Sequence, residues 1–167
     1  MISMTEWLLD EFTEEARSTR RVLKRIPEDK LSWKPHPKSM SLGELALHVA
    51  VLPGELAEFF SESERKVPTV PLPEASSLNE ILTAFDKSES IAKTKLSAWK
   101  EDDMLAEWKM VHGEETVISA PRYMMVRSTM LNHWYHHRGQ LVVYLRLLDI
   151  PVPAVYGSSA DEELIGS

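Results

Sequence analysis

The sequence predicts an all-α protein, a four-helix bundle formed by a single domain over residues 1–167. Three observations support this fold class. Four stretches carry apolar residues at steps of three and four, the period of a helix that buries one face. Strand-like alternation is confined to one short region, 105–120. The length of 167 residues suits one domain with one buried core.

The first predicted helix covers residues 4–26. Its inward face carries Leu8, Phe12, Ala16, Thr19, Leu23 and Ile26. Pro27 ends this pattern because proline has no amide hydrogen to donate to a helix. Residues 27–40 contain three prolines and are expected to form a loop, with Trp33 packed down on the core.

A second helix is predicted to begin near Ser41. Ser41 and Glu44 have the spacing of a capping box, in which each side chain accepts a hydrogen bond from the other residue's amide. The stripe that follows comprises Leu42, Leu45, His48, Val49, Leu52, Leu56 and Phe59. Residues 61–76 are charged at first and then rich in proline. This long segment is compatible with a crossover connection between the second and third helices.

A third helix is predicted to begin at Ser77, with Glu80 as the capping partner. Its buried face carries Ile81, Leu82, Phe85, Ala92, Leu96 and Trp99. Residues 105–120 fit a small hairpin before the last helix. Pro121 suits the first turn of that last helix, which is expected to run to about Leu148.

Composition narrows the function. The chain has no cysteine, so any thiol chemistry would need an external thiol. The net charge is −7, so the chain lacks the excess of basic residues that is typical of a nucleic-acid-binding protein. No secretory signal is visible, and no apolar run approaches the roughly 20 residues that cross a bilayer. We therefore expect a cytoplasmic protein that acts on a small molecule and binds neither nucleic acid nor membrane.

The last predicted helix holds three histidines within five residues: His133, His136 and His137. Positions four apart lie on the same face of a helix, so His133 and His137 point the same way. The buried side of this helix is defined by Val126, Met130, Leu141, Tyr144 and Leu148. At about 100° per residue, His137 falls near the middle of this arc, His133 at its edge and His136 on the flank.

His48 interrupts the apolar stripe of the second helix, so it also points inward. A buried imidazole needs a partner for each ring nitrogen, and one shared cation satisfies a nitrogen on each ring. Neutral imidazole is the commonest metal ligand in proteins. We therefore predict that His48, His133 and His137 bind one divalent metal ion. The alternative is that these three histidines are hydrogen-bonded core residues without a metal. Of the remaining histidines, His36 and His112 are expected at the surface.

Three protein ligands leave a coordination position open, as in catalytic metal sites. A metal there can lower the pKa of bound water to about 7, and a bound thiol would lose its proton. One hypothesis is therefore an enzyme that activates an external thiol or water, with His136 and Arg138 as candidate helpers at the rim. A second is a non-catalytic, metal-binding stress-response protein. A third is an interaction module without metal.

Three segments of the chain together resemble the DinB-like family, damage-inducible bundle proteins related to bacterial thiol-dependent S-transferases. They are residues 42–49, residues 130–141 and the tail at 151–162. The most specific pattern is His-x-x-x-His-Arg-Gly-Gln, which begins at His133. The resemblance extends over nearly the whole chain.

The resemblance implies a four-helix bundle with a long crossover connection, often assembled as a homodimer. It also implies a metal, zinc or nickel, bound by the residues that match His48, His133 and His137. Some relatives resemble enzymes that add bacillithiol, mycothiol or glutathione to small electrophiles. The expected activity is therefore that of a metal-dependent S-transferase, with a low-molecular-weight thiol as co-substrate, or of a hydrolase.

Overall fold

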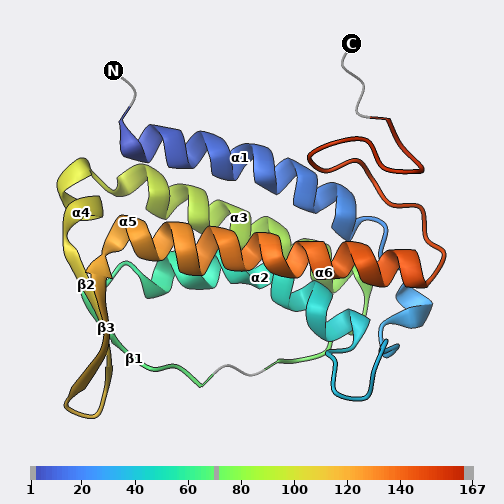
Figure 1. The fold of residues 1–167 in the computed structure, drawn as a ribbon, viewed down its shortest axis with the longest axis horizontal. Coiled ribbons are helices and arrows are strands. Elements are labelled where there is room, and N and C mark those ends of the chain that lie inside the picture. The colour runs from blue at the N-terminus through green and yellow to red at the C-terminus, as the bar shows by residue number, and fades with distance from the viewer. Residues whose placement is uncertain (1–2, 70–71, 164–167) are drawn as a thin grey trace.

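The computed structural model describes residues 3–69 and 72–163, and this part of the chain is mostly helical (Figure 1). The predicted helical class is confirmed. The long helices are α1 (Met4–Leu23), α2 (Leu42–Phe59) and α3 (Leu78–Ala98), together with a last helix built from α5 (Arg122–Met125), η2 (Val126–Asn132) and α6 (His133–Leu147). Two short helical turns, η1 (Glu28–Lys30) and α4 (Glu101–Leu105), lie in the connections.

The long helices lie side by side, and the connection after α2 sets their directions. It leads from the end of α2 to the start of α3 at the opposite end of the molecule, so α2 and α3 run the same way (Figure 1). This is the predicted crossover. Both α2 and α1 contact α3 and α6, which encloses a core that includes Phe12, Phe85 and Trp134. Among the described residues, no helix is both long and apolar enough to cross a membrane.

A small three-stranded sheet covers one end of the helices. β2 (Glu107–His112) and β3 (Glu115–Pro121) form the predicted antiparallel hairpin, which turns at Gly113 with a φ of 63°. β1 (Glu64–Lys66) adds a parallel strand beside β2 and was not predicted. The three residues of β1 are charged and show no apolar alternation, so they carry no sequence signal for a strand.

The predicted helix starts are largely confirmed. Ser41 caps α2 with a complete box, since the Glu44 carboxylate accepts from the Ser41 amide at 2.6 Å and the Ser41 hydroxyl accepts from the Glu44 amide at 3.1 Å. At α3 the box is half formed. Ser77 accepts from the Glu80 amide, but the Glu80 carboxylate accepts from the Ser76 amide instead.

Pro53 lies inside α2 and changes how this helix meets its neighbours. Proline cannot donate to the carbonyl four residues earlier, and this Val49 carbonyl accepts from the Trp134 indole at 2.9 Å. The next amide, that of Gly54, donates to the Ser88 hydroxyl of α3 at 2.8 Å. The carbonyl that Pro53 leaves without a helical donor thus joins α2 to Trp134 of α6, and the Gly54 amide joins α2 to α3.

Candidate metal centre

His48 of α2 meets His133 and His137 of α6 between the two helices. One ring nitrogen from each lies within 4.8 Å of the other two, and the three form a group that can hold a metal ion. The ring centroids are separated by 5.6 Å for His48 and His133, 4.7 Å for His48 and His137, and 4.5 Å for His133 and His137. The structure therefore brings together the three side chains that the sequence predicted would converge.

The helical phase of α6 explains which histidines take part. His137 is buried and His133 is half-buried, as expected for the middle and the edge of the inward arc. His136 is exposed, with its ring 5.1 Å from that of His137, so it lies beside the cluster. His36 and His112 are exposed, as predicted.

The outer nitrogens of the two α6 histidines have hydrogen-bond acceptors. His137 Nδ1 lies 2.8 Å from the Gln140 side-chain oxygen, which can only accept. The His133 ring hydrogen-bonds to the backbone of Thr129, one turn earlier, where a carbonyl is the acceptor. These acceptors favour the tautomer in which each ring carries its proton on the outer nitrogen. This leaves a lone pair on each inner nitrogen, Nε2.

The two Nε2 atoms lie 2.7 Å apart. Neutral imidazole has one N–H, so two rings whose protons sit on the outer nitrogens have no hydrogen to share between the inner ones. A cation placed among the rings would turn this pair of facing lone pairs into a favourable arrangement. Three imidazole nitrogens suit zinc or nickel, and the residues present therefore fit a divalent metal.

A proton added to one of the rings could also join the two inner nitrogens, but burial opposes this. Burial lowers the pKa of His48 to about 4, with smaller contributions from the charges of His137 and His133. Burial also lowers the pKa of His133, although the hydrogen bond to Thr129 acts in the other direction. The pKa of His137 is lowered for the same reason, partly offset by Gln140. At neutral pH the cluster is thus composed of uncharged imidazoles, the form that binds metal.

Sequence reasoning missed the groups that support the two α6 histidines. Gln140 lies three residues after His137, a spacing at which helix side chains meet, and this was an available signal. Thr129 lies in η2, a π-helical segment that directly precedes His133. π-Helical segments occur frequently at functional sites. The sequence does not reveal this one, because one extra residue in a helical turn barely alters the spacing of the apolar residues.

Arg138 does not lie at the rim of the cluster. It is 2% exposed and faces α1, where its guanidinium pairs with the Glu15 carboxylate at 2.6 Å. It also donates to the hydroxyls of Thr19 and Tyr156. Arg138 therefore joins α6 to α1 and to the C-terminal tail, and the hypothesis that it assists at the site is wrong.

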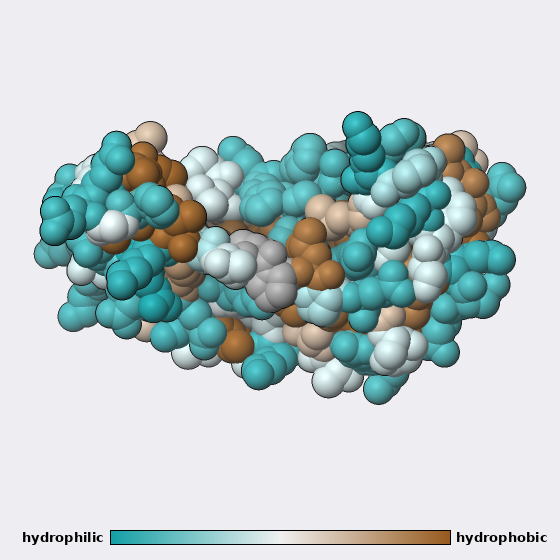
Figure 2. Space-filling view, turned by 90° about the horizontal axis from the view of Figure 1, so that it is seen from below, coloured by the Kyte–Doolittle hydropathy of each residue, from teal (hydrophilic) through white to brown (hydrophobic). Residues whose placement is uncertain are grey.

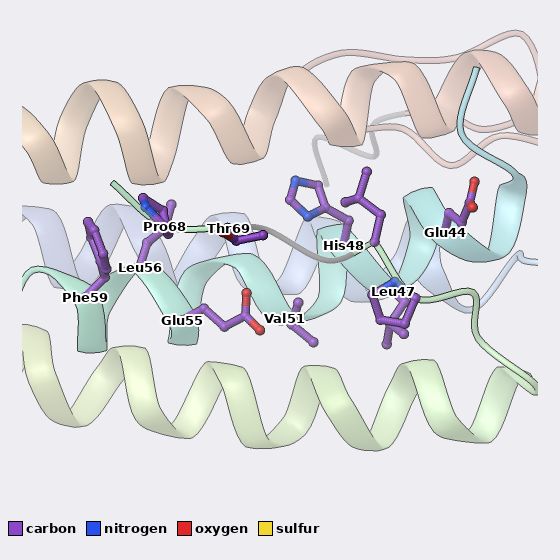
Figure 3. A pocket seen from close by; sticks show the side chains of 11 residues that line it. Glu44, Leu47, His48, Val51, Glu55, Leu56, Phe59, Pro68 and Thr69 are labelled. Carbon is purple, nitrogen blue, oxygen red and sulfur yellow. The ribbon is translucent and has the colours of Figure 1, made fainter. Parts of the chain in front are cut away.

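A pocket of about 360 Å³ lies between α2 and the connection that follows it, with His48 in its wall (Figure 3). Figure 2 shows this side of the molecule, where apolar residues are exposed on an otherwise mostly hydrophilic face. The lining residues are Glu44, Leu47, His48, Val51, Glu55, Leu56, Phe59, Pro68, Thr69, Leu72 and Pro73. A small molecule held here would lie against His48, the member of the cluster that lines the pocket.

Comparisons with known proteins agree with this fold. The DinB family model matches residues 1–163. The chain is 22% identical over 162 residues to the uncharacterized protein YrdA of Bacillus subtilis, which covers 97% of this chain and 93% of YrdA. A crystal structure of a DinB-like protein from Bacillus cereus matches with a TM-score of 0.73 and 26% identity, over 93% of this chain and 100% of that chain.

A second crystal structure, of the DinB-like protein YjoA from Bacillus subtilis, shares the fold. Its TM-score is 0.66 at 19% identity, over 86% of this chain and 92% of that chain. The family model covers nearly the whole sequence and includes all three histidines of the cluster. The chain therefore belongs to the DinB family.

Proposed function

We propose that this protein binds one divalent metal ion, zinc or nickel, through His48, His133 and His137. The observation that carries the proposal is the pair of inner nitrogens of His133 and His137, 2.7 Å apart, whose rings each have a hydrogen-bond acceptor on the outer side. Membership of the DinB family supports it, since the family resemblance implies metal at these positions.

We further propose that the metal centre acts on a small electrophilic substrate with an external thiol or water as nucleophile. When bound, the metal would supply Lewis acidity that lowers the pKa of that nucleophile. The chain has no cysteine of its own, which favours a low-molecular-weight thiol such as bacillithiol, mycothiol or glutathione. The pocket beside His48 offers a place for the electrophile. The resemblance also supports a cytoplasmic homodimer.

The activity is tested with zinc- or nickel-loaded protein, each candidate thiol and the electrophile 1-chloro-2,4-dinitrobenzene. In this reaction the thiol sulfur bonds to the ring carbon while chloride and a proton leave. We expect metal-dependent turnover with at least one thiol, and loss of turnover in His137→Ala. His136→Ala is the matched control, because His136 is exposed beside the cluster. Absence of metal-dependent turnover with every thiol would contradict the transferase proposal.

A second candidate function is a non-catalytic, metal-binding stress-response protein. The observation that favours it is that the three histidines come from two helices, so a bound metal would join α2 to α6. Metal that binds only the folded chain stabilises it by mass action. We expect a chelator to lower the melting temperature of the metal-loaded protein. An unchanged melting temperature would contradict a stabilising role.

A further inference from the structure

One face of α2 forms the inner wall of the pocket beside the histidine cluster (Figure 3). Along this face, His48, Val51, Glu55 and Phe59 follow one another at helical spacing and all line the pocket. The opposite wall comes from the connection after β1 and includes Leu72. The lining is thus mostly apolar, and its polar members among the described residues are Glu44, His48, Glu55 and Thr69.

The carboxylates of Glu44 and Glu55, both on this wall, differ in their hydrogen-bond and ion-pair partners. The Glu44 carboxylate accepts from the Ser41 amide at 2.6 Å and lies 3.3 Å from the Lys34 ammonium. Its charge is therefore already matched by the start of α2 and by a lysine. The exposed Glu55 carboxylate has no hydrogen bond or ion pair with any residue within 3–69 and 72–163. Of the two carboxylates on the pocket wall, that of Glu55 is therefore the one without a positively charged partner among the described residues.

Among the pocket-lining residues that the structure describes there is no lysine or arginine. Arg65 and Lys66 line a separate hollow that adjoins it beyond Phe59. The Arg65 guanidinium stacks on the Phe59 ring, 5.4 Å from its centroid, and donates to the Phe59 carbonyl. Arg65 is thus held against Phe59. Within the described part of the chain, Glu55 is the unpaired charge on the pocket wall, and on its other side it lines a further hollow with Lys87, to which it makes no ion pair.

We propose that this pocket binds small molecules with an apolar body and a positively charged end that lies against Glu55. Glu55 lies seven positions after His48 in α2, or roughly 10 Å along the axis. A metal at the histidine cluster would repel a cation, so the charged end points away from it and the uncharged end faces the nucleophile. This inference rests on the proposed function, because it names the class of substrate for the same site.

The test compares two probes of the same shape, a (4-phenylbutyl)trimethylammonium ion and its neutral tert-butyl isostere. Neither can coordinate a metal, so the ratio of their dissociation constants reports the charge of the pocket. We expect Glu55→Gln to reduce the preference for the cation by about threefold to fivefold, the upper part of the range of an exposed charge pair. Glu55→Lys should reduce it further. Titration calorimetry on zinc-loaded protein measures both constants.

The matched control is Glu58, which is exposed on α2 but does not line this pocket. Glu58→Gln and Glu58→Lys should leave the ratio unchanged. Val51→Phe adds bulk to the middle of the wall and should weaken both probes alike. The proposal is overturned if the ratio ignores Glu55, if Glu58 changes it equally, or if Val51→Phe leaves both constants unchanged.

Zinc content measured on the same samples separates the two proposals. Zinc-loaded protein whose ratio ignores Glu55 contradicts this inference and leaves metal binding intact. Protein that retains neither zinc nor nickel contradicts the proposed function, and the effect of Glu55 on the ratio is then judged on that metal-free protein by the same criteria.

Discussion

Gln140 determines which nitrogen His137 presents to the cluster. Its side-chain oxygen, 2.8 Å from Nδ1, holds the ring proton there and leaves Nε2 free. We expect Gln140→Leu to weaken metal affinity by about 10- to 100-fold, the usual effect of removing the group that orients a histidine ligand. Gln140→Glu keeps an acceptor and should keep the affinity. Competition with a chromophoric chelator measures both, and equal affinity in Gln140→Leu would refute this role.

The lowered pKa of His48 predicts how the stability of the metal-free protein depends on pH. Folding lowers this pKa from 6.5 to about 4. Between these values the unfolded chain binds more protons, so stability falls as the pH is lowered through this window. Because His48 is only half-buried, we expect its contribution to be about 1–2 kcal/mol.

The control for this effect is His48→Gln, which removes the titrating group. The difference in unfolding free energy between the wild type and this variant should shrink as the pH is lowered from about 6.5 to about 4. Urea denaturation at several pH values measures it. A difference that stays constant over that range would show that His48 does not titrate as its burial predicts.

At the scale of the elements, α2 and α3 are in close contact where Gly54 meets Ser88. A Cβ on Gly54 would lie 2.8 Å from Ser88 Cα, which is backbone and cannot turn aside. We expect Gly54→Ala to destabilise the protein by about 1–3 kcal/mol through overpacking. Gly139→Ala is the control, because nothing lies within 4 Å of its added Cβ in α6. That variant should gain about 0.5–1 kcal/mol, and equal effects in denaturant would contradict this account of packing.

The long helices could be predicted because each combines local signals with a period that one buried face imposes. Ser41 with Glu44, for example, marks the start of α2 before any tertiary contact is known. The π-helical η2 and the strand β1 could not be predicted. The first changes only the backbone hydrogen bonds within a helix, and the second exists because β2 lies beside it.

For the whole molecule, the decisive feature is the convergence of His48 with two histidines more than 80 positions later in the chain. The sequence predicted this because each residue interrupts an apolar face and must therefore point into the same core. It could not reveal the pocket, since the position of the connection across α2 follows from tertiary structure. It also gave no reason to place Arg138 on the side of α1, where Glu15 pairs with it.

The metal content of the purified protein after dialysis against zinc or nickel is the most direct test of the account. We expect one ion per chain in the wild type, and none in His48→Ala, His133→Ala or His137→Ala when those variants are folded. His136→Ala should retain its ion. A wild-type protein that binds no ion, or a full complement in His137→Ala, would show that the three imidazoles are a hydrogen-bonded core cluster and not a metal centre.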